Sequence, residues 1–327
     1  MSYMFYDCPL ISDIPSLITD TVTDMSYMFS KCTGLNKADM RAFNFGYTTT
    51  LASMFEDCSN LTEIDFTGSD FRNVSTWTNI TKNCSDLTKV DLTNCKIGNG
   101  FRFSNILGEK VYNNLDTSAL THTKYLFTDP NKNKVDISNF DLSNVTDMSY
   151  TFSGNTSNSI ILGNVDTSKV TNMSFMFNGC NKITHLDLSG LDVSKVTNMA
   201  NIFYNCTSLN TIDTTGWNTE NLTSLNSAFY YVPADINISH WNTSKVTDIN
   251  YMFQYYSGSS IVLDNLDLSK VTAYSSMWSN MSTSITLSLN NTKLFSGFKV
   301  APKATSVSLN NTMGYLVGMF NGCTALT

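Results

Sequence analysis

The eight cysteines are the residues of this chain whose type and spacing could do chemistry, as disulfides or as metal ligands. Seven of them stand three residues after the same marker position of a repeated phrase. Successive turns of a stacked chain lie ~4.8 Å apart, within reach of a disulfide, but parallel side chains give poor bridge geometry. No Cys-x-x-Cys or Cys-x-x-His pair supplies zinc ligands, so we expect buried free thiols and no metal or other cofactor. The seven are Cys8, Cys32, Cys58, Cys84, Cys180, Cys206 and Cys323, and the exception is Cys95.

A first acidic series could hold calcium, because carboxylates repeated at ~4.8 Å can share a cation. Like charges at that distance also repel by about 0.9 kcal/mol in water. A neighbouring row formed by Lys37, Glu63 and Lys89 alternates in sign and offsets much of this repulsion. We therefore prefer a solvated charged face over a calcium site. The acidic series comprises Asp39, Asp65 and Asp91, followed by Asp187 and Asp213.

A second series of Asp and Asn follows an apolar residue or Trp, where such side chains accept backbone N–H groups at a turn. We expect these bonds to form a ladder from turn to turn, a structural task that makes the series a poor catalytic candidate. The histidines His122, His185 and His240 occupy different phases of the repeat, and no glycine-rich phosphate loop follows a strand. The sequence therefore argues against an enzyme. The second series is Asp116, Asp141, Asp166, Asp192, Asn218, Asn242 and Asp267.

One phrase positions all these residues. Residues 165–180 read Val-Asp-Thr-Ser-Lys-Val-Thr-Asn-Met-Ser-Phe-Met-Phe-Asn-Gly-Cys, and the phrase restarts at Leu191. Such restarts, 24 to 26 residues apart, predict a solenoid. The marker position, the aromatic residue after the second Met, is found at Phe5, Phe29, Phe55, Phe127, Phe152, Phe177, Phe203, Phe229, Phe253, Trp278 and Phe320.

Two kinds of element make one turn of the solenoid. Residues 61–66 alternate apolar and polar side chains, which predicts a half-buried strand. Met25, Met28 and Phe29 fall at i, i+3 and i+4, which predicts a short helix with Thr23 as its N-cap. We expect an α/β repeat solenoid with one parallel sheet on one side and short helical turns on the other. Residues 1–327 should form a single elongated domain of about 13 turns.

The phrase at residues 241–253, with the Met-Phe-x-x-Cys close seen at Met28 to Cys32, resembles the 26-residue BspA-type leucine-rich repeat of bacterial surface proteins. The resemblance implies a curved leucine-rich-repeat solenoid at the cell surface. It also implies adhesion to protein or glycan on a host or neighbouring cell. Members of this family also occur in phages and mobile DNA. A structural or receptor-binding component of a fibre or phage virion is therefore the alternative.

Composition excludes other classes of partner. The chain carries a net charge of −7 and only 14% charged residues, and no cluster of Lys and Arg offers a nucleic-acid surface. No apolar run approaches the ~20 residues of a membrane helix, so we expect no membrane insertion. No secretory signal is visible in this chain, so the extracellular or cell-surface location rests on the resemblance.

Both ends of the sequence lie inside the repeat. Residues 1–5 match residues 25–29 one for one, and residues 319–327 stop where the next strand should start. Repeat arrays normally need polar capping turns. We expect either a piece of a longer protein or weak end-to-end self-association.

Aromatic residues mark a candidate binding region in the later turns. They occupy positions where other turns carry small or polar residues, and Trp217 and Trp241 recur at a second phase. Tyr and Trp suit protein or sugar recognition, although all of them could instead fill or shield the core. Degenerate turns near 95–114 and 292–318 are either loops on a binding face or merely weakened repeats. The predicted binding residues are Tyr204, Tyr230, Tyr231, Tyr255, Tyr256 and Trp278.

Overall fold

The computed structural model describes residues 1–128, 134–314 and 316–326. Each coil runs through a short strand, a corner and a return segment before the next coil begins.

The chain packs as two compact units. Unit 1 comprises Met1–Asp129 and Asn139–Asn144, and unit 2 comprises Pro130–Ser138 and Val145–Thr327. Each unit is a parallel β-solenoid in which successive coils stack on one another. The expectation of one elongated domain over residues 1–327 therefore stays a prediction.

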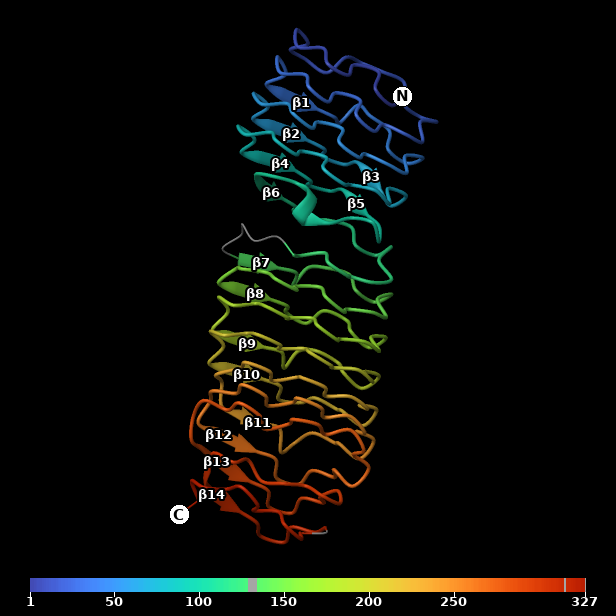
Figure 1. Ribbon diagram of the computed structural model, residues 1–327. Helices are drawn as coiled ribbons and strands as arrows, with labels where there is room; N and C mark the ends of the chain where they lie inside the picture. Colours follow the sequence, from blue (N-terminus) through green and yellow to red (C-terminus); the bar gives the residue numbers. More distant parts are fainter. Residues whose placement is uncertain (129–133, 315, 327) are drawn as a thin grey trace. The chain divides into compact units, whose positions relative to one another are not determined.

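In unit 1, β1, β2, β4 and β6 form one parallel sheet, and β3 pairs with β5 in a second. These strands lie one below another in Figure 1. The elements are β1 (Lys37–Asp39), β2 (Glu63–Asp65), β3 (Asp70–Phe71), β4 (Lys89–Asp91), β5 (Lys96–Ile97), the 3-10 helix η1 (Phe103–Asn105) and β6 (Glu109–Val111).

In unit 2, β11 to β14 form a four-stranded parallel sheet, and the pairs β7–β8 and β9–β10 form two smaller ones. The prediction of a single sheet is therefore wrong in detail. The strands are only two to five residues long, so the loss of one or two bonds interrupts a ladder. The strands are β7 (Lys134–Asp136), β8 (Ser159–Ile161), β9 (His185–Asp187), β10 (Thr211–Asp213), β11 (Ile236–Asn237), β12 (Ser260–Val262), β13 (Ile285–Ser288) and β14 (Ala304–Ser308).

The alternating pattern correctly predicts which strand side chains are buried. Leu61, Ile64 and Phe66 are at most 1% exposed, whereas Glu63 and Asp65 between them are half-buried. The strands thus present one apolar face to the core and one polar face to solvent, as period-two patterning requires.

The prediction of helical turns is wrong. In the segment that begins at Met25, short bonds within the coil, such as Ser30 N to Tyr27 O (3.2 Å), alternate with bonds to the next coil, such as Phe29 N to Met54 O (2.9 Å). Tyr27 and Lys31 have φ of 55° and 62°, in the left-handed region. A left-handed residue at every fourth position cannot continue a helix, so Thr23 caps none. Among the described residues, η1 is the only helical element.

These segments, which we call linked turns, place the marker rings in a column inside each unit. In unit 1, Phe29 stacks on Phe55 with 5.7 Å between ring centroids. In unit 2 the centroid separations of successive rings are 5.4, 5.9, 5.8, 5.5 and 5.1 Å, and the rings concerned are Phe152, Phe177, Phe203, Phe229, Phe253 and Trp278.

The two degenerate segments correspond to short coils. Hydrogen-bonded partners on neighbouring coils are 26 residues apart for Asp267 and Lys293, which is the usual offset. The offset falls to 20 residues between Asn94 and Asn114 and between Asn291 and Asn311. Each short coil therefore lacks about six residues, the length of a linked-turn segment.

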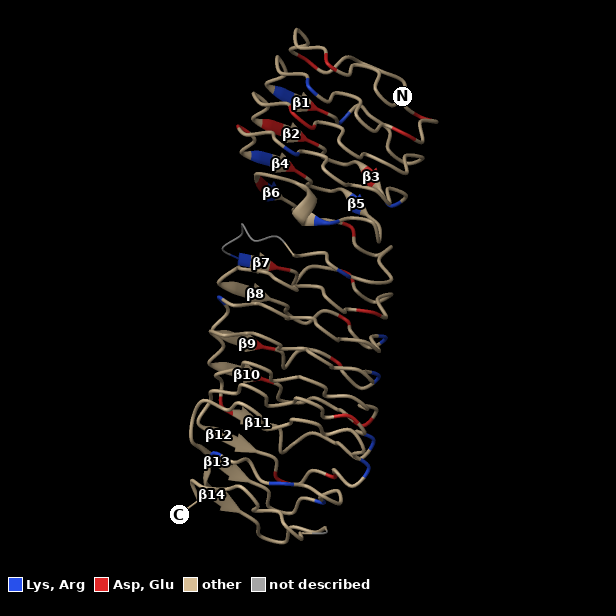
Figure 2. Ribbon diagram, viewed as in Figure 1, with Lys and Arg blue, Asp and Glu red and all other residues tan. Residues whose placement is uncertain are grey.

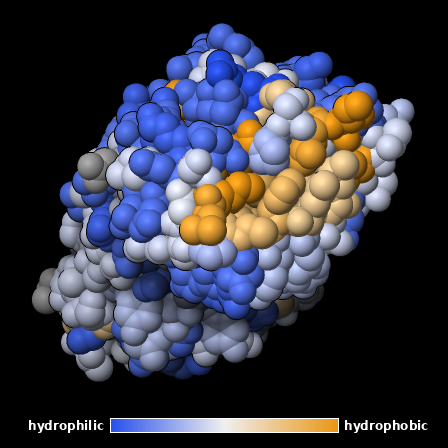
Figure 3. Space-filling view, turned by 90° about the horizontal axis from the view of Figure 1, so that it is seen from above, coloured by the Kyte–Doolittle hydropathy of each residue, from blue (hydrophilic) through white to orange (hydrophobic). Residues whose placement is uncertain are grey.

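Charge and exposed apolar surface are unevenly distributed. Figure 2 shows charged strands at β1, β2 and β4, while β11 to β14 carry no charged residue. The first coil of unit 1 leaves large apolar side chains exposed, including Met4 (50%), Leu10 (95%) and Ile18 (83%). Figure 3 shows an apolar patch on this end of the unit.

Candidate binding site

The cysteines form a buried thiol ladder, which confirms the predicted burial for most of them. The thiol of Cys58 donates to the carbonyl oxygen of Phe29 on the preceding coil (3.0 Å), and Cys84 does the same to Phe55 (2.9 Å). Burial raises the pKa of Cys84 to about 12. The thiols are therefore weak hydrogen-bond donors between coils as well as fillers, and Cys8 and Cys323 are only half-buried.

The alternating charged row forms as expected. Glu63 lies 3.0 Å from the Lys37 ammonium and 3.1 Å from that of Lys89, on the two adjacent strands. Arg41 pairs with Asp39 (2.7 Å) and holds the pKa of that carboxyl down at about 2. Over the described part of the chain, no three potential ligands among His, Cys, Asp and Glu come together as a metal site.

Members of the second acidic series form turns within their own coils, and Asp267 also accepts the Lys293 ammonium of the following coil (3.1 Å). The carboxylate of Asp116 accepts the backbone N–H (3.1 Å) and the hydroxyl (2.6 Å) of Ser118, and these bonds lower its pKa. The bond between coils comes instead from the neighbouring Thr117, whose hydroxyl donates to Asp141 O at 3.0 Å. The predicted ladder therefore runs through threonine, because a two-residue turn already uses the carboxylate.

Four of the six predicted binding residues converge on the linked turns of three successive coils. Tyr204 stacks on Tyr230 with 4.3 Å between centroids, and Tyr231 stacks on Tyr255 at 4.4 Å. Edge-to-face contacts of 5.1 Å (Tyr230–Tyr231) and 5.5 Å (Tyr230–Tyr255) join the two pairs. We call these four residues the tyrosine cluster. Tyr231 is 41% exposed and the other three are half-buried.

The other two predicted residues are buried. Tyr256 is fully enclosed, and its hydroxyl lies 2.8 Å from both Ala234 O and Ser260 O. It follows Tyr255 directly, so its side chain turns to the opposite side of the coil. Trp278 is 8% exposed and closes the ring column against Phe253. The prediction that both are surface contacts is wrong in this respect, although Trp278 still lines a cavity.

Sequence reasoning missed that cavity. It has a volume of about 570 Å³ and lies between the coil of Trp278 and the second short coil. Tyr274, Phe295 and Phe298 add to its aromatic lining. The signal in the sequence was the missing linked-turn segment.

Trp217 and Trp241 are 4% and 3% exposed, and their rings stack with 5.4 Å between centroids. They are therefore core residues, which is the alternative to a binding role that the sequence left open.

Two members of the tyrosine cluster occupy a left-handed position that other coils fill with Asn, Asp, Lys or Gly. Tyr231 and Tyr255 both have φ of 55°, at a position where neighbouring coils place Asn205 and Asn280. Asn tolerates the left-handed region better than a bulky side chain. Partial burial, followed by a hydrogen bond with Tyr204, raises the pKa of Tyr230 to about 12, so this phenol stays protonated at physiological pH.

Two of the three histidines, His185 and His240, contact threonines. His185 pairs through its ring with the Thr211 hydroxyl, and His240 Nε2 lies 2.9 Å from Thr214 O. Neither contact is a catalytic arrangement.

Comparison with known proteins identifies a family. The family described as "Mycoplasma protein of unknown function, DUF285" matches residues 1–94, 93–211, 121–235 and 213–295. A search among curated proteins gave no match. A leucine-rich repeat protein from Bacteroides ovatus is similar at 16% identity and a TM-score of 0.43, over 98% of this chain and 74% of that one. A leucine-rich repeat protein from Leptospira interrogans is similar at 11% identity and a TM-score of 0.22, over 93% and 86% of the two chains.

Across the residues described, no helix has the length and apolar character needed to cross a membrane.

Proposed function

We propose that this chain, which belongs to the DUF285 family, is a non-catalytic scaffold that binds a protein or glycan partner through the tyrosine cluster. We further propose that it acts in adhesion at a cell surface. The surface location is supported by the resemblance of its phrase to BspA-type repeats.

The observation that carries this proposal is the backbone conformation of Tyr231 and Tyr255. A left-handed conformation costs a residue with a side chain roughly 1–2 kcal/mol, and Asn or Gly would relieve part of that cost. Stacking of the two rings returns only about 0.5–1.5 kcal/mol. Tyrosine at both positions therefore adds little to the stability of the fold. An amphipathic ring on the surface does suit recognition of a partner.

The surroundings of the cluster also suit a neutral partner. The outward strand positions of the three coils that carry the cluster are Asp213, Asn237 and Val262. The second and third of these positions carry no fixed charge that a partner would have to desolvate. Uncharged sugars and the polar surfaces of proteins both meet this condition.

The test replaces Tyr231 and Tyr255 together by Asn, the residue that other coils use at this position. Binding to cells or to an array of glycans should fall at least tenfold, while the thermal midpoint stays within a few degrees of the wild type. The matched control is Tyr150→Asn, which removes a left-handed stacked ring outside the cluster. Unchanged binding by the double variant would contradict the proposal and favour a structural role in a fibre or virion.

A further inference from the structure

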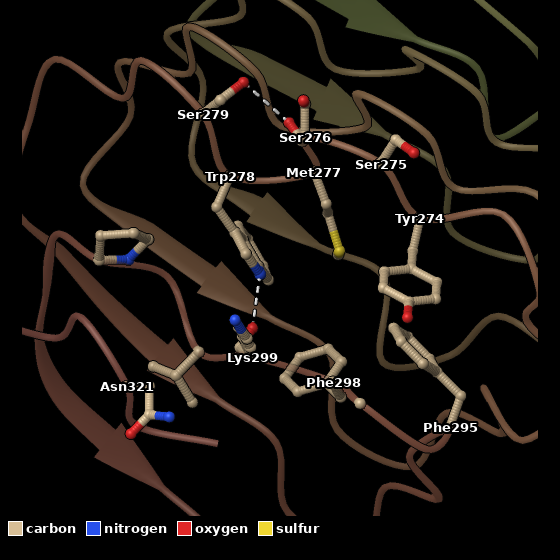
Figure 4. Close-up of a pocket in the computed structure, with 13 residues that line it drawn as sticks. Tyr274, Ser275, Ser276, Met277, Trp278, Ser279, Phe295, Phe298, Lys299 and Asn321 are labelled. Atoms are coloured by element: carbon tan, nitrogen blue, oxygen red, sulfur yellow. Dashed lines mark hydrogen bonds between the residues drawn. The ribbon is translucent and has the colours of Figure 1, made fainter. Parts of the chain in front are cut away.

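The cavity beside Trp278 is walled by aromatic rings and edged by polar groups (Figure 4). Tyr274 and Phe295 lie 4.5 Å apart between centroids, and Phe295 and Phe298 lie 5.4 Å apart. The indole N–H of Trp278 donates to Lys299 O (2.7 Å), which fixes this ring at the cavity wall. A volume of about 570 Å³ falls in the range of ligand sites.

The cavity exists because the ring column is interrupted there. Phe298 meets Trp278 edge-on, at an interplanar angle of 86°, instead of stacking on it. In the first short coil, by contrast, η1 supplies Phe103, whose ring stacks on Phe127 at 4.8 Å. The second short coil has no such helix. The space that a linked turn fills in a regular coil is therefore only partly filled here.

The backbone on the cavity side continues the pattern by which coils join. On the preceding coil, the N–H groups of Tyr251, Phe253 and Tyr255 donate to the carbonyl oxygens of Ser275, Met277 and Ser279, at 2.9, 3.0 and 3.0 Å. The equivalent donors one coil later are the N–H groups of Ser276, Trp278 and Asn280. Within the described residues, these three N–H groups have no hydrogen-bond acceptor. Ser276 and Trp278 line the cavity and Asn280 follows directly, so the three donors keep the phase of a complete coil-to-coil contact.

We propose that this cavity binds a peptide that carries the Met-x-x-Met-Phe phrase of the repeat. Alternate peptide carbonyls accept the three N–H groups, as the carbonyls of a following coil would. The peptide Phe enters the aromatic pocket below Trp278, where the next marker ring of a regular column would stand. This is recognition by extension of an existing backbone ladder, with a side-chain pocket supplying specificity. The site is independent of the tyrosine cluster and does not rest on the function proposed above.

The test uses an acetylated, amidated octapeptide with the sequence of residues 25–32, titrated calorimetrically into the 327-residue chain in reducing buffer. A peptide with both Met and the Phe replaced by Ser is the ligand control, and maltose is the sugar control. The blocking variant is Ser276→Tyr, which the backbone tolerates because Tyr251 occupies the same left-handed position one coil earlier. The matched variant, Asn201→Tyr, introduces the same ring at that position of a complete coil, beside Phe175.

We expect one peptide to bind per chain, at least tenfold more weakly to Ser276→Tyr and equally well to Asn201→Tyr. Hydrogen exchange over residues 275–281 should slow when the peptide binds, and exchange over residues 200–206 should not change. The variant in which Tyr231 and Tyr255 are Asn should bind the peptide normally, which separates this site from the tyrosine cluster. Equal binding of the serine peptide, binding of maltose alone, or exchange that does not slow at 275–281 would overturn the proposal.

Discussion

At the scale of single residues, coils are joined by rings and thiols that repeat in phase. Phe177 lies between Phe152 (5.4 Å) and Phe203 (5.9 Å), and its carbonyl oxygen accepts the thiol of Cys206 at 3.1 Å. Each coil therefore contributes to two interfaces. In such arrays stability is close to a sum of nearest-neighbour terms, so damage to one ring weakens both contacts.

Replacement of Phe177 by Ala should lower the free energy of unfolding by about 3–5 kcal/mol, because a fully buried ring leaves a cavity. Phe177→Asp or Met176→Asp should unfold at least the local coils, since an unpaired charge enters the core. Urea denaturation followed by circular dichroism measures both. Phe320 occupies the same marker position but is 42% exposed, so Phe320→Ala should cost much less. Equal effects at the two positions would argue against the ring column as the main packing element.

The pair of Asp39 and Arg41 predicts a small acid-dependent loss of stability. The pKa of Asp39 is lowered from 3.8 to about 2 in the folded chain. The contribution is therefore complete above about pH 4 and is lost as the pH falls towards 2. Both side chains are largely exposed, so the loss should stay below about 1 kcal/mol. Urea midpoints between pH 5 and pH 2 should fall less in Asp39→Asn than in the wild type, and parallel curves would refute this.

At the scale of elements, the sequence predicts strands better than linked turns. The alternation at residues 61–66 has one physical meaning, a half-buried strand. The spacing of Met25, Met28 and Phe29 fits two structures, a short helix and linked turns, because both point these residues inward. The overlooked signal was Asn, Asp or Gly recurring four residues apart, as at Asn201 and Asn205, which is typical of left-handed backbone.

The same limits apply to the candidate sites. Adjacent aromatics in the sequence do not reveal which one faces out, so the pattern does not separate Tyr255 from the buried Tyr256. The sequence did locate the degenerate turn at residues 292–318. Whether a missing segment is filled, as by Phe103, or left open depends on three-dimensional packing that spacing alone does not encode.

Substitution of Gly179 distinguishes linked turns from a helix, because the change in stability has opposite signs in the two structures. Its φ is 72°, and an added Cβ would have its nearest neighbour at 3.7 Å, an ordinary contact. Gly179→Ala should therefore destabilise unit 2 by about 1 kcal/mol through backbone strain alone. Gly179→Asn should cost less, because Asn tolerates this region. In a helix the Ala variant would gain about 1 kcal/mol instead, so a raised urea midpoint would contradict the linked-turn description.

At the scale of the whole molecule, both units join successive coils by the same kinds of backbone hydrogen bond. In the linked turns, N–H groups of a coil donate to carbonyls of the following coil, as Phe5 N does to Met28 O (2.9 Å) and Phe253 N to Met277 O (3.0 Å). At other positions the bonds run the opposite way, as where Thr62 N donates to Asn36 O of the preceding coil (2.8 Å). Any coil without a neighbour presents half of this interface.

The exposed apolar side chains of the first coil lead to a prediction for the 327-residue chain. Met4, Leu10 and Ile18 of this coil are 50%, 95% and 83% exposed. We predict weak, concentration-dependent association through this end, detected by analytical ultracentrifugation as a rise in average mass. Replacing Met4 and Leu10 by Lys should abolish it. Tyr47→Lys, at a side chain 65% exposed elsewhere on unit 1, should not. A chain that stays monomeric at millimolar concentration would show that an open coil alone does not drive association.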